Sequence, residues 1–265
     1  MSYRIDFACD DRDPLQQELN ALYDYRDDWP TKVQHRARLN LFHLLLEDLG
    51  RRGLIGRRGA ALDVGCNAGY YSKMLSDTGY AAVHGVDIEP GLVKRAERAF
   101  GSNAPGHTLT FEVADAERLD TSRRYDFVLC TEVIEHTSQP GRVIANLAEV
   151  VAPGGILVVS LPNACSPPFQ LARLIAAVRR KPKDPVFEDH LRWPFWRILG
   201  LFRDTGLERV RATGVNLVLD DHVLSWAYGK PFFPALSRLN FELSRRAPLC
   251  YVSQFFFMAY KRRDG

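Results

Sequence analysis

The stretch Ala61-Leu-Asp-Val-Gly-Cys-Asn-Ala-Gly69, followed by Tyr-Tyr-Ser, sets the architecture of this 265-residue chain. Residues 60–64 form a short apolar run next to glycine, which predicts a buried strand because the run is too short for a helix. Gly65 and Gly69 permit a tight turn and let a ligand approach main-chain N–H groups. A helical pattern begins at Tyr70, so the positive end of a helix would face the same space. Strand, glycine turn and helix together indicate a nucleotide-type pocket.

The glycine turn does not match the common phosphate-binding patterns. A dinucleotide site would read G-x-G-x-x-G, whereas Gly65-Cys-Asn-Ala-Gly69 lacks the middle glycine. No Gly-Lys-Ser/Thr follows, so a P-loop is excluded. Asp63, just before the turn, would repel a pyrophosphate but could accept hydrogen bonds from an ammonium group or from main-chain donors. Taken alone, the turn is also compatible with an α/β protein that binds no ligand.

Further apolar runs follow at the spacing of a parallel α/β sheet. The run from Ala82 to Ile88 contains Asp87, placed where such folds carry the carboxylate that binds ribose hydroxyls. Helix-length segments separate the successive runs, which predicts one doubly wound, mostly parallel sheet. The remaining expected strands cover residues 109–113, 125–130, 155–160, 207–212 and 251–260.

Five ordered motifs resemble those of class I S-adenosylmethionine-dependent methyltransferases. They read Leu62-Asp-Val-Gly-Cys-Asn-Ala-Gly69, Val86-Asp-Ile88, Asp115-Ala116, Glu132-Val-Ile-Glu-His136 and Ala152-Pro-Gly-Gly155. The resemblance covers about residues 55–165 and implies an α/β, Rossmann-like, seven-stranded sheet whose last strand is antiparallel. Asn67 replaces the second glycine of the family's D-x-G-x-G-x-G loop. This departure is mild because asparagine tolerates left-handed backbone angles.

The same resemblance implies S-adenosylmethionine as the cofactor and assigns its contacts. Asp63 and the glycine loop would hold the methionine end, and Asp87 would hold the ribose. Ile88 would pack on the adenine, with Asp115 and Ala116 at its edge. The expected cofactor-binding residues are Asp63, Gly65, Cys66, Asn67, Gly69, Asp87, Ile88, Asp115, Ala116 and Thr131.

Glu132, Glu135 and His136 follow the fourth strand at spacings of three and four, which places them on one face of a helical turn. Two carboxylates and an imidazole suit a divalent cation such as Mg²⁺ or Mn²⁺. This E-x-x-E-H turn resembles the metal-binding turn of two groups, the ubiquinone-pathway O-methyltransferases and the small-RNA 3′-terminal 2′-O-methyltransferases. In the RNA group a downstream histidine completes the site, and His190 is its counterpart here. The metal prediction is therefore Glu132, Glu135, His136 and His190.

A site without metal is the open alternative. A glutamate at a helix start is also favoured by the helix dipole, and the histidine could act as a general base. In both cases His136 and His190 are the predicted catalytic residues, close to the reacting hydroxyl. His222 is a weaker candidate base, and both His190 and His222 could equally be solvated loop residues.

We expect three regions: an N-terminal helical cap at 1–58, the cofactor-binding core at 59–165, and an acceptor-binding region with the last two strands at 166–265. In the cap, helices are expected to start at Pro14 and, capped by Thr31, at Lys32. Tyr23, Tyr25 and Trp29 would then lie near the acceptor, or serve as core aromatics. Residues 214–250 are expected to be irregular and rich in aromatic residues.

Charge is distributed unevenly along the chain. Residues 1–160 carry 18 basic and 23 acidic side chains, whereas residues 161–265 carry 17 and 9, for net charges of −5 and +8. This asymmetry favours an anionic partner near the C-terminal half, although a solvated basic surface explains it equally well. Phe232-Phe233 and Phe255-Phe-Phe257, near basic residues, would suit a lipid-linked acceptor or form core strands.

Composition predicts a protein of the reducing cytoplasm. The five cysteines have no C-x-x-C spacing, and the chain shows no signal-peptide core and no transmembrane-length apolar run.

The leading prediction is an O-methyltransferase acting on a small hydroxylated acceptor, neutral or anionic, such as a sugar, polyol or phenol, with or without a divalent metal. The alternatives are RNA ribose 2′-O-methylation, N-methylation and a non-catalytic binding subunit. Nucleic acid is the less favoured partner because no RNA-binding signature accompanies the basic residues. The choice between a monomer and a homodimer is left open.

Overall fold

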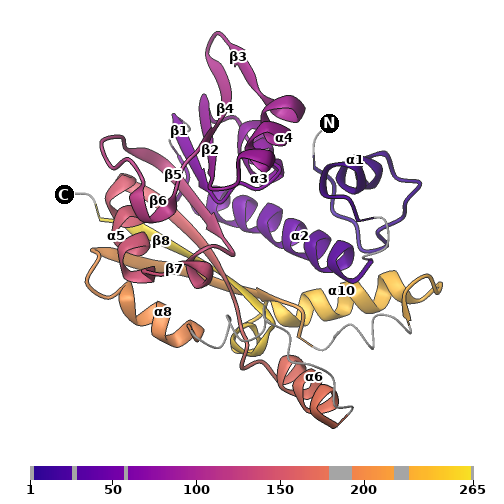
Figure 1. The fold of residues 1–265 in the computed structure, drawn as a ribbon. Helices are drawn as coiled ribbons and strands as arrows, with labels where there is room; N and C mark the ends of the chain where they lie inside the picture. The colour runs from indigo at the N-terminus through magenta and orange to yellow at the C-terminus, as the bar shows by residue number, and fades with distance from the viewer. Residues whose placement is uncertain (1–2, 26–28, 57–58, 179–192, 218–226, 264–265) are drawn as a thin grey trace.

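The computed structural model describes residues 3–25, 29–56, 59–178, 193–217 and 227–263 (Figure 1). Its centre is an eight-stranded sheet with the order β3-β4-β2-β1-β5-β6-β8-β7. The strands are β1 (Ala60–Val64), β2 (Ala82–Asp87), β3 (Ser102–Ala104), β4 (His107–Val113), β5 (Tyr125–Thr131), β6 (Val151–Pro162), β7 (Leu207–Val215) and β8 (Phe255–Arg262).

The sheet confirms the doubly wound, Rossmann-like prediction. β1 pairs in parallel with β2 and with β5, and β4 and β6 extend the parallel sheet on either side. β8, the last strand, runs antiparallel to both β6 and β7, as expected. The described sheet has one strand more than predicted, because three residues of β3 pair antiparallel with β4. β3 is short and polar, so it carries no apolar run that would have indicated a strand.

The described helices cover both faces of the sheet. They are α1 (Pro14–Tyr23), α2 (Trp29–Arg51), α3 (Tyr70–Asp77), α4 (Pro90–Phe100), α5 (Pro140–Val150), α6 (Pro167–Val178), α8 (Phe195–Leu201) and α10 (Phe233–Ser244). Short 3₁₀ turns are η1 (Ala116–Arg118), η2 (Ile134–His136) and η3 (Leu249–Val252). One buried cluster joins α1, α2 and α3 to the sheet, and a second joins α5 and α8 to it.

Two local predictions about helices were wrong. α2 begins at Trp29, so Thr31 lies within the helix and does not cap it. Residues 214–250, expected to be irregular, contain α10 and η3. The inner face of α10 includes the buried polar residues Asn240 and Ser244, and these interrupt the apolar periodicity that identifies a helix in a sequence. The start of α1 was predicted correctly: the Asp13 carboxylate accepts the Leu15 N–H, and Pro14 follows it.

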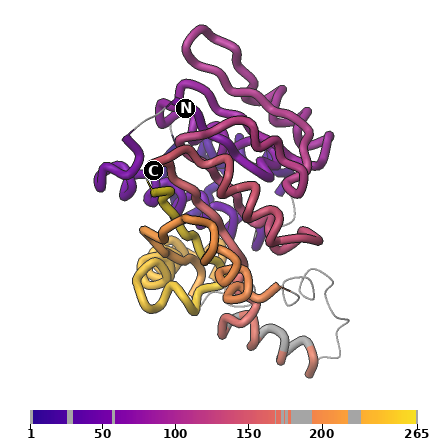
Figure 2. The backbone as a smooth tube through the Cα atoms, turned by 90° about the vertical axis from the view of Figure 1, so that its left-hand side faces the viewer, coloured from indigo at the N-terminus to yellow at the C-terminus, as the bar shows by residue number. Residues whose placement is uncertain are grey.

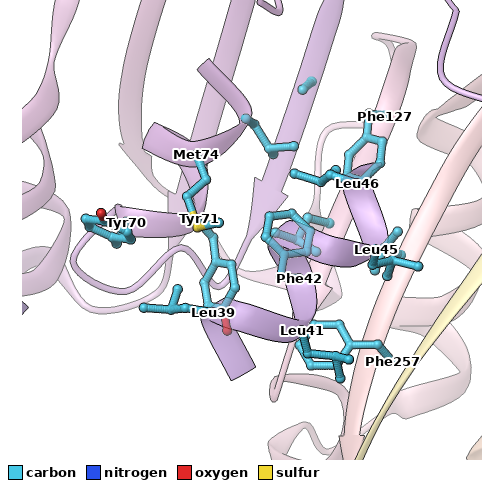
Figure 3. Close-up of a cluster of buried hydrophobic side chains, with 14 of the residues drawn as sticks. Leu39, Leu41, Phe42, Leu45, Leu46, Tyr70, Tyr71, Met74, Phe127 and Phe257 are labelled. Atoms are coloured by element: carbon cyan, nitrogen blue, oxygen red, sulfur yellow. The ribbon is translucent and has the colours of Figure 1, made fainter. Parts of the chain in front are cut away.

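The N-terminal helices are part of the main core. The apolar face of α2 is buried against the sheet, where Phe42 lies near Tyr71 of α3 and Phe257 of β8 (Figure 3). Full burial of a leucine or phenylalanine side chain stabilises a fold by about 1.5–3 kcal/mol. α2 is thereby fixed to the sheet, and its N-terminal half is held next to the ends of the parallel strands.

Two further sequence features can be compared with the described residues. All five cysteines are free thiols, and Cys66 and Cys130 are buried. None of the described helices combines the length and the apolar character needed to cross a bilayer.

Candidate active site

A cavity of about 530 Å³ opens where β1, β2 and β5 end. The carboxyl ends of parallel strands are the usual ligand-binding edge of a doubly wound sheet, and the volume lies within the range of small-molecule sites. The lining residues are Tyr23, His35, Arg38, Val64, Gly65, Cys66, Asn67, Tyr71, Asp87, Ile88, Leu92, Ala114, Asp115, Ala116, Glu117, Thr131, Glu132, Val133, His136, Thr137 and Ser138.

The turn after β1 forms one wall and has the predicted left-handed geometry. Gly65, Asn67 and Gly69 have φ angles of +76°, +50° and +88°. Gly65 also packs closely, because a Cβ added to it would lie 2.1 Å from Cγ2 of Val133. Asn67 adopts a left-handed angle without glycine, which explains how the loop accommodates its departure from the family pattern.

Asp87 connects the turn after β1 to the loop after β2. Its Oδ2 accepts the Asn67 N–H at 2.8 Å, and its Oδ1 accepts the Glu89 N–H at 2.9 Å. Beside it, Ile88 lines the cavity with 68% of its surface exposed. An exposed apolar side chain next to a fixed carboxylate offers one group to a flat ring and another to hydroxyls.

Asp63 lies behind the cavity wall. It is fully buried, and Ser72 Oγ donates a hydrogen bond to its Oδ2 at 2.6 Å. Burial raises the pKa of Asp63 to about 7. Within the described residues its Oδ1 has no hydrogen-bond partner. A buried carboxylate with one unused acceptor suits a ligand that carries a positive charge or N–H donors.

The wall around Asp115 is held by its own hydrogen bonds. Asp115 accepts the Glu117 N–H at 2.8 Å and so caps η1. Glu117 accepts the main-chain N–H groups of Ser138 and Gln139 at 2.7 and 3.0 Å. These bonds tie the loop after β4 to the loop after β5.

Eight of the ten residues predicted to bind the cofactor therefore line the cavity. Asp63 and Gly69 do not, because the first lies below the glycine turn and the second begins α3, where a Cβ would meet Phe111 at 2.9 Å. The eight lining residues are Gly65, Cys66, Asn67, Asp87, Ile88, Asp115, Ala116 and Thr131.

Glu132 follows β5 in a left-handed conformation with φ +54°. Its Oε1 accepts a hydrogen bond from Ser160 Oγ at 2.7 Å, and its Oε2 lies 3.5 Å from Arg38 Nη1. Burial raises the pKa of Glu132, and the positive charge of Arg38 opposes that shift. A non-glycine residue held at such an angle at a cavity wall is typical of functional sites.

Glu135 and His136 belong to the 3₁₀ turn η2. Glu135 is only 3% exposed, and among the described residues neither carboxylate oxygen has a hydrogen-bond partner. Burial, and then the negative charge of Glu132, raise the pKa of Glu135 well above its usual range. His136 lines the cavity with 45% of its side chain exposed, and its Nε2 lies 3.8 Å from Glu135 Oε1.

The described residues give no support for a divalent cation at Glu132, Glu135 and His136. In the part of the chain that the structure describes, no three His, Cys, Asp or Glu side chains are grouped as metal ligands. Glu132 is engaged by Ser160 and by the cation of Arg38, and Glu135 is enclosed by the core. His190 and His222 lie outside the described residues, so their predicted roles stay predictions.

The sequence did not indicate that α2 contributes to the cavity. His35 and Arg38 line it from the N-terminal half of α2, next to Tyr71 of α3. Burial, followed by the charges of Arg38 and Arg36, lowers the pKa of His35 well below its usual value. The available signal in the sequence was a pair of polar residues, His35 and Arg38, three positions apart beside the apolar face of the helix. That signal does not show that the helix packs next to the cavity, which only the folded chain reveals.

The aromatic residues of the N-terminal region have different positions. Tyr23 lines the cavity, and its predicted place near the acceptor stays a prediction. Tyr25 is buried behind it and its hydroxyl is hydrogen-bonded to His35 Nδ1. The side chain of Trp29 lies outside the described residues.

Residues 62–159 match the family model described as "Methyltransferase domain". The ubiquinone biosynthesis O-methyltransferase of Coxiella burnetii (strain Dugway 5J108-111) is 29% identical over 149 residues, which cover 56% of this chain and 62% of that protein. The protein of the same name from Xanthomonas axonopodis pv. citri (strain 306) is 33% identical over 150 residues, or 55% and 58% of the two chains. The chain thus spans about three-fifths of these relatives.

Two solved structures show the same fold. The PH0226 protein of Pyrococcus horikoshii OT3 aligns with a TM-score of 0.56 at 16% identity, over 93% of this chain and 99% of that one. Magnesium protoporphyrin IX methyltransferase from Synechocystis PCC 6803 with bound SAH aligns with a TM-score of 0.54 at 17% identity, over 94% and 88%. Residues 62–159 are therefore similar to a methyltransferase domain, and the chain shares its fold with these two solved structures.

Proposed function

We propose that this protein transfers a methyl group from S-adenosylmethionine to a hydroxyl of a small acceptor such as a phenol, sugar or polyol. The observation that carries the proposal is a single cavity lined by the glycine turn, Asp87 and Ile88 as well as by His136. One part offers acceptors and an apolar surface to a nucleoside, and the other offers a base. The relatives named as O-methyltransferases support oxygen as the accepting atom.

The residues around the glycine turn suit the cofactor by their charge. Its methionine end carries an ammonium group, a carboxylate and a sulfonium. Asp63 supplies a buried carboxyl below the turn, and Arg38 supplies a cation that lines the cavity. Opposite charges of this kind would orient the zwitterion, and positioning contributes much of the rate of an in-line displacement.

His136 is the candidate general base. In the transfer, the acceptor oxygen forms a bond to the methyl carbon while the carbon–sulfur bond breaks, and the electron pair leaves with the sulfur. The hydroxyl proton passes to the His136 imidazole. Glu135 lies next to that imidazole, and a negative charge there would favour the protonated ring.

Assistance by Mg²⁺ or Mn²⁺ was part of the sequence prediction. The arrangement of Glu132, Glu135 and His136 among the described residues gives it no support, so no step of the proposed reaction uses a metal.

A comparison of two histidine variants tests this proposal. Wild type is incubated with methyl-labelled cofactor and a panel of phenols, polyols, sugars, amines and RNA, and the labelled product is identified. His136→Ala should lower turnover of the selected acceptor by about 10²–10⁴-fold, the usual contribution of a general base, while the affinity for S-adenosylhomocysteine stays unchanged. The matched control is His107→Ala. His107 begins β4, whereas the cavity lies beyond the other end of that strand.

Two results would contradict the proposal. Wild-type turnover in His136→Ala would remove the histidine from the chemistry. Methyl transfer only to amines or only to RNA would replace hydroxyl methylation of a small acceptor by one of the alternatives.

A further inference from the structure

α6 presents an apolar face that the described residues leave uncovered. Leu171, Leu174 and Val178 are exposed, the last two by 62% and 76%. Their spacing of three and four puts them on one side of the helix. α6 lies at the lower end of the molecule in both views and projects away from the sheet (Figures 1 and 2). The apolar face is therefore on a protrusion.

α10 and η3 carry further exposed apolar residues. Phe232, Leu239 and Leu243 are exposed at positions i, i+7 and i+11, which form one stripe along α10. Three of the four residues of η3 are exposed apolar or aromatic residues: Leu249, Tyr251 and Val252.

Hydrogen bonds and a ring contact hold the start of α6 against η3 and the start of β8. Asn163, just before α6, donates from its Nδ2 to the carbonyl oxygens of Tyr251 and Ser253 at 3.3 and 3.0 Å. The ring of Phe169 in α6 lies edge-on to Phe255, with 6.4 Å between centroids. We use the term α6–α10 face for the surface made by Leu171, Leu174, Val178, Phe232, Leu239, Leu243, Leu249, Tyr251 and Val252.

The segments that carry this face are basic. Residues 161–178 and 227–254 contain five basic side chains and one acidic side chain. The acidic one, Glu242, is paired with Arg245 at 2.7 Å. Arg238 and Arg246 are exposed next to the apolar stripe of α10. An apolar face flanked by arginines is complementary to a layer with an oily interior and anionic headgroups.

We propose that the α6–α10 face docks on a lipid bilayer that carries anionic headgroups. Monomeric soluble proteins rarely expose large contiguous apolar patches unless the patch has a function. A projecting apolar helix can enter the boundary between headgroups and acyl chains, as interfacial helices do. The phenylalanines that first suggested a lipid contact have another role, because Phe233 and Phe255–Phe257 are buried in the core.

A chain of contacts links α6 to the cavity. Phe255, which contacts α6, also lies under the guanidinium of Arg38, with 4.7 Å from Cζ to the ring centroid. Arg38 lines the cavity. A bilayer on this face would therefore meet the side of the site where α2 and β8 adjoin. Docking itself does not depend on the proposed methyl transfer and is tested separately.

Vesicle sedimentation tests the docking. The full chain is mixed with phosphatidylcholine vesicles with and without phosphatidylglycerol, at low and high salt. Wild type should bind the anionic vesicles, and binding should weaken with salt because exposed charges are screened. Leu174→Ser combined with Val178→Ser should weaken binding by at least about tenfold, as expected for losing the burial of these side chains. Arg246→Gln should weaken it by about fivefold.

Val113→Ser is the matched control, since Val113 is also an exposed valine but lies at the end of β4. It should bind like wild type. Circular dichroism of each variant separates lost docking from lost folding. Absence of wild-type binding to anionic vesicles, or equal binding by the double variant, would overturn the proposal. So would a wild-type dimer that the double variant converts to monomer without any vesicle binding, because the face would then join two copies.

Discussion

Asp63 shows how a single buried carboxyl can make stability depend on pH. Its pKa is raised to about 7 when folded, compared with about 3.9 when exposed in an unfolded chain. Between these values the folded state binds more protons than the unfolded state. The free energy of unfolding should therefore fall as pH rises through this window, by up to about 1.4 kcal/mol per pH unit from this group.

Asp63→Asn should lose that part of the slope, because an amide does not titrate. Urea unfolding of both proteins between about pH 4 and about pH 7 measures it. Glu132 and Glu135 have raised pKa values as well, but they are present in both proteins, so the difference between slopes reports Asp63. Equal slopes would show that Asp63 titrates as an exposed carboxyl.

The residues of the glycine turn and of the β2 end could be predicted to line one cavity because their positions are encoded locally. The left-handed angles of Gly65, Asn67 and Gly69 follow from a turn squeezed between β1 and α3. Asp87 ends the next strand of the same sheet. The catalytic side was less accessible. Arg38 reaches Glu132 across 94 positions of sequence, and no local pattern reports such a contact.

At the scale of the elements, the β1–α3 turn allows the cost of backbone strain to be measured separately from the cost of side-chain crowding. Gly65 and Gly106 have nearly the same φ angles, +76° and +77°. A Cβ on Gly65 would collide with Val133, whereas a Cβ on Gly106 would meet no atom within 4 Å among the described residues. In both alanine variants the strain of the left-handed backbone should lower the free energy of unfolding by about 1–2 kcal/mol. In Gly65→Ala overpacking should lower it by a further ~1–3 kcal/mol.

Chemical denaturation gives both free energies, and titration with S-adenosylhomocysteine gives the effect on the site. Gly65→Ala should also weaken cofactor binding, because Val133 and the turn both line the cavity. Gly106→Ala should leave the affinity unchanged. Equal destabilisation and equal affinity in the two variants would mean that the turn is not tightly packed.

The strands that contain strong apolar runs could be predicted from the sequence. The two elements that were missed, β3 and α10, lack a clear apolar pattern. β3 has three residues, two of them exposed. α10 buries polar groups on its inner face and exposes leucines on its outer face, so its pattern reads as irregular. The exposed leucines, Leu239 and Leu243, obscured the helical pattern of α10 in the sequence, and they belong to the α6–α10 face.

Across the whole molecule, one sheet edge collects groups from distant parts of the chain. α2 contributes His35 and Arg38, the parallel strands contribute the loops, and β8 places Phe255 beneath Arg38. The motifs between residues 55 and 165 predicted the fold and the cofactor class, since family patterns in that region fix the nucleotide side. The contribution of α2 to the cavity depends on packing between the N-terminal helices and the sheet, which the motifs do not contain.

Isothermal titration calorimetry with S-adenosylhomocysteine tests whether this cavity is the cofactor site. Wild type and the His107→Ala control should bind one equivalent with the same affinity. Asp87→Ala should bind at least about tenfold more weakly, because a hydrogen bond to a charged group contributes about 1.5–3 kcal/mol. Absence of binding to wild type, or an unchanged affinity in Asp87→Ala, would contradict the account.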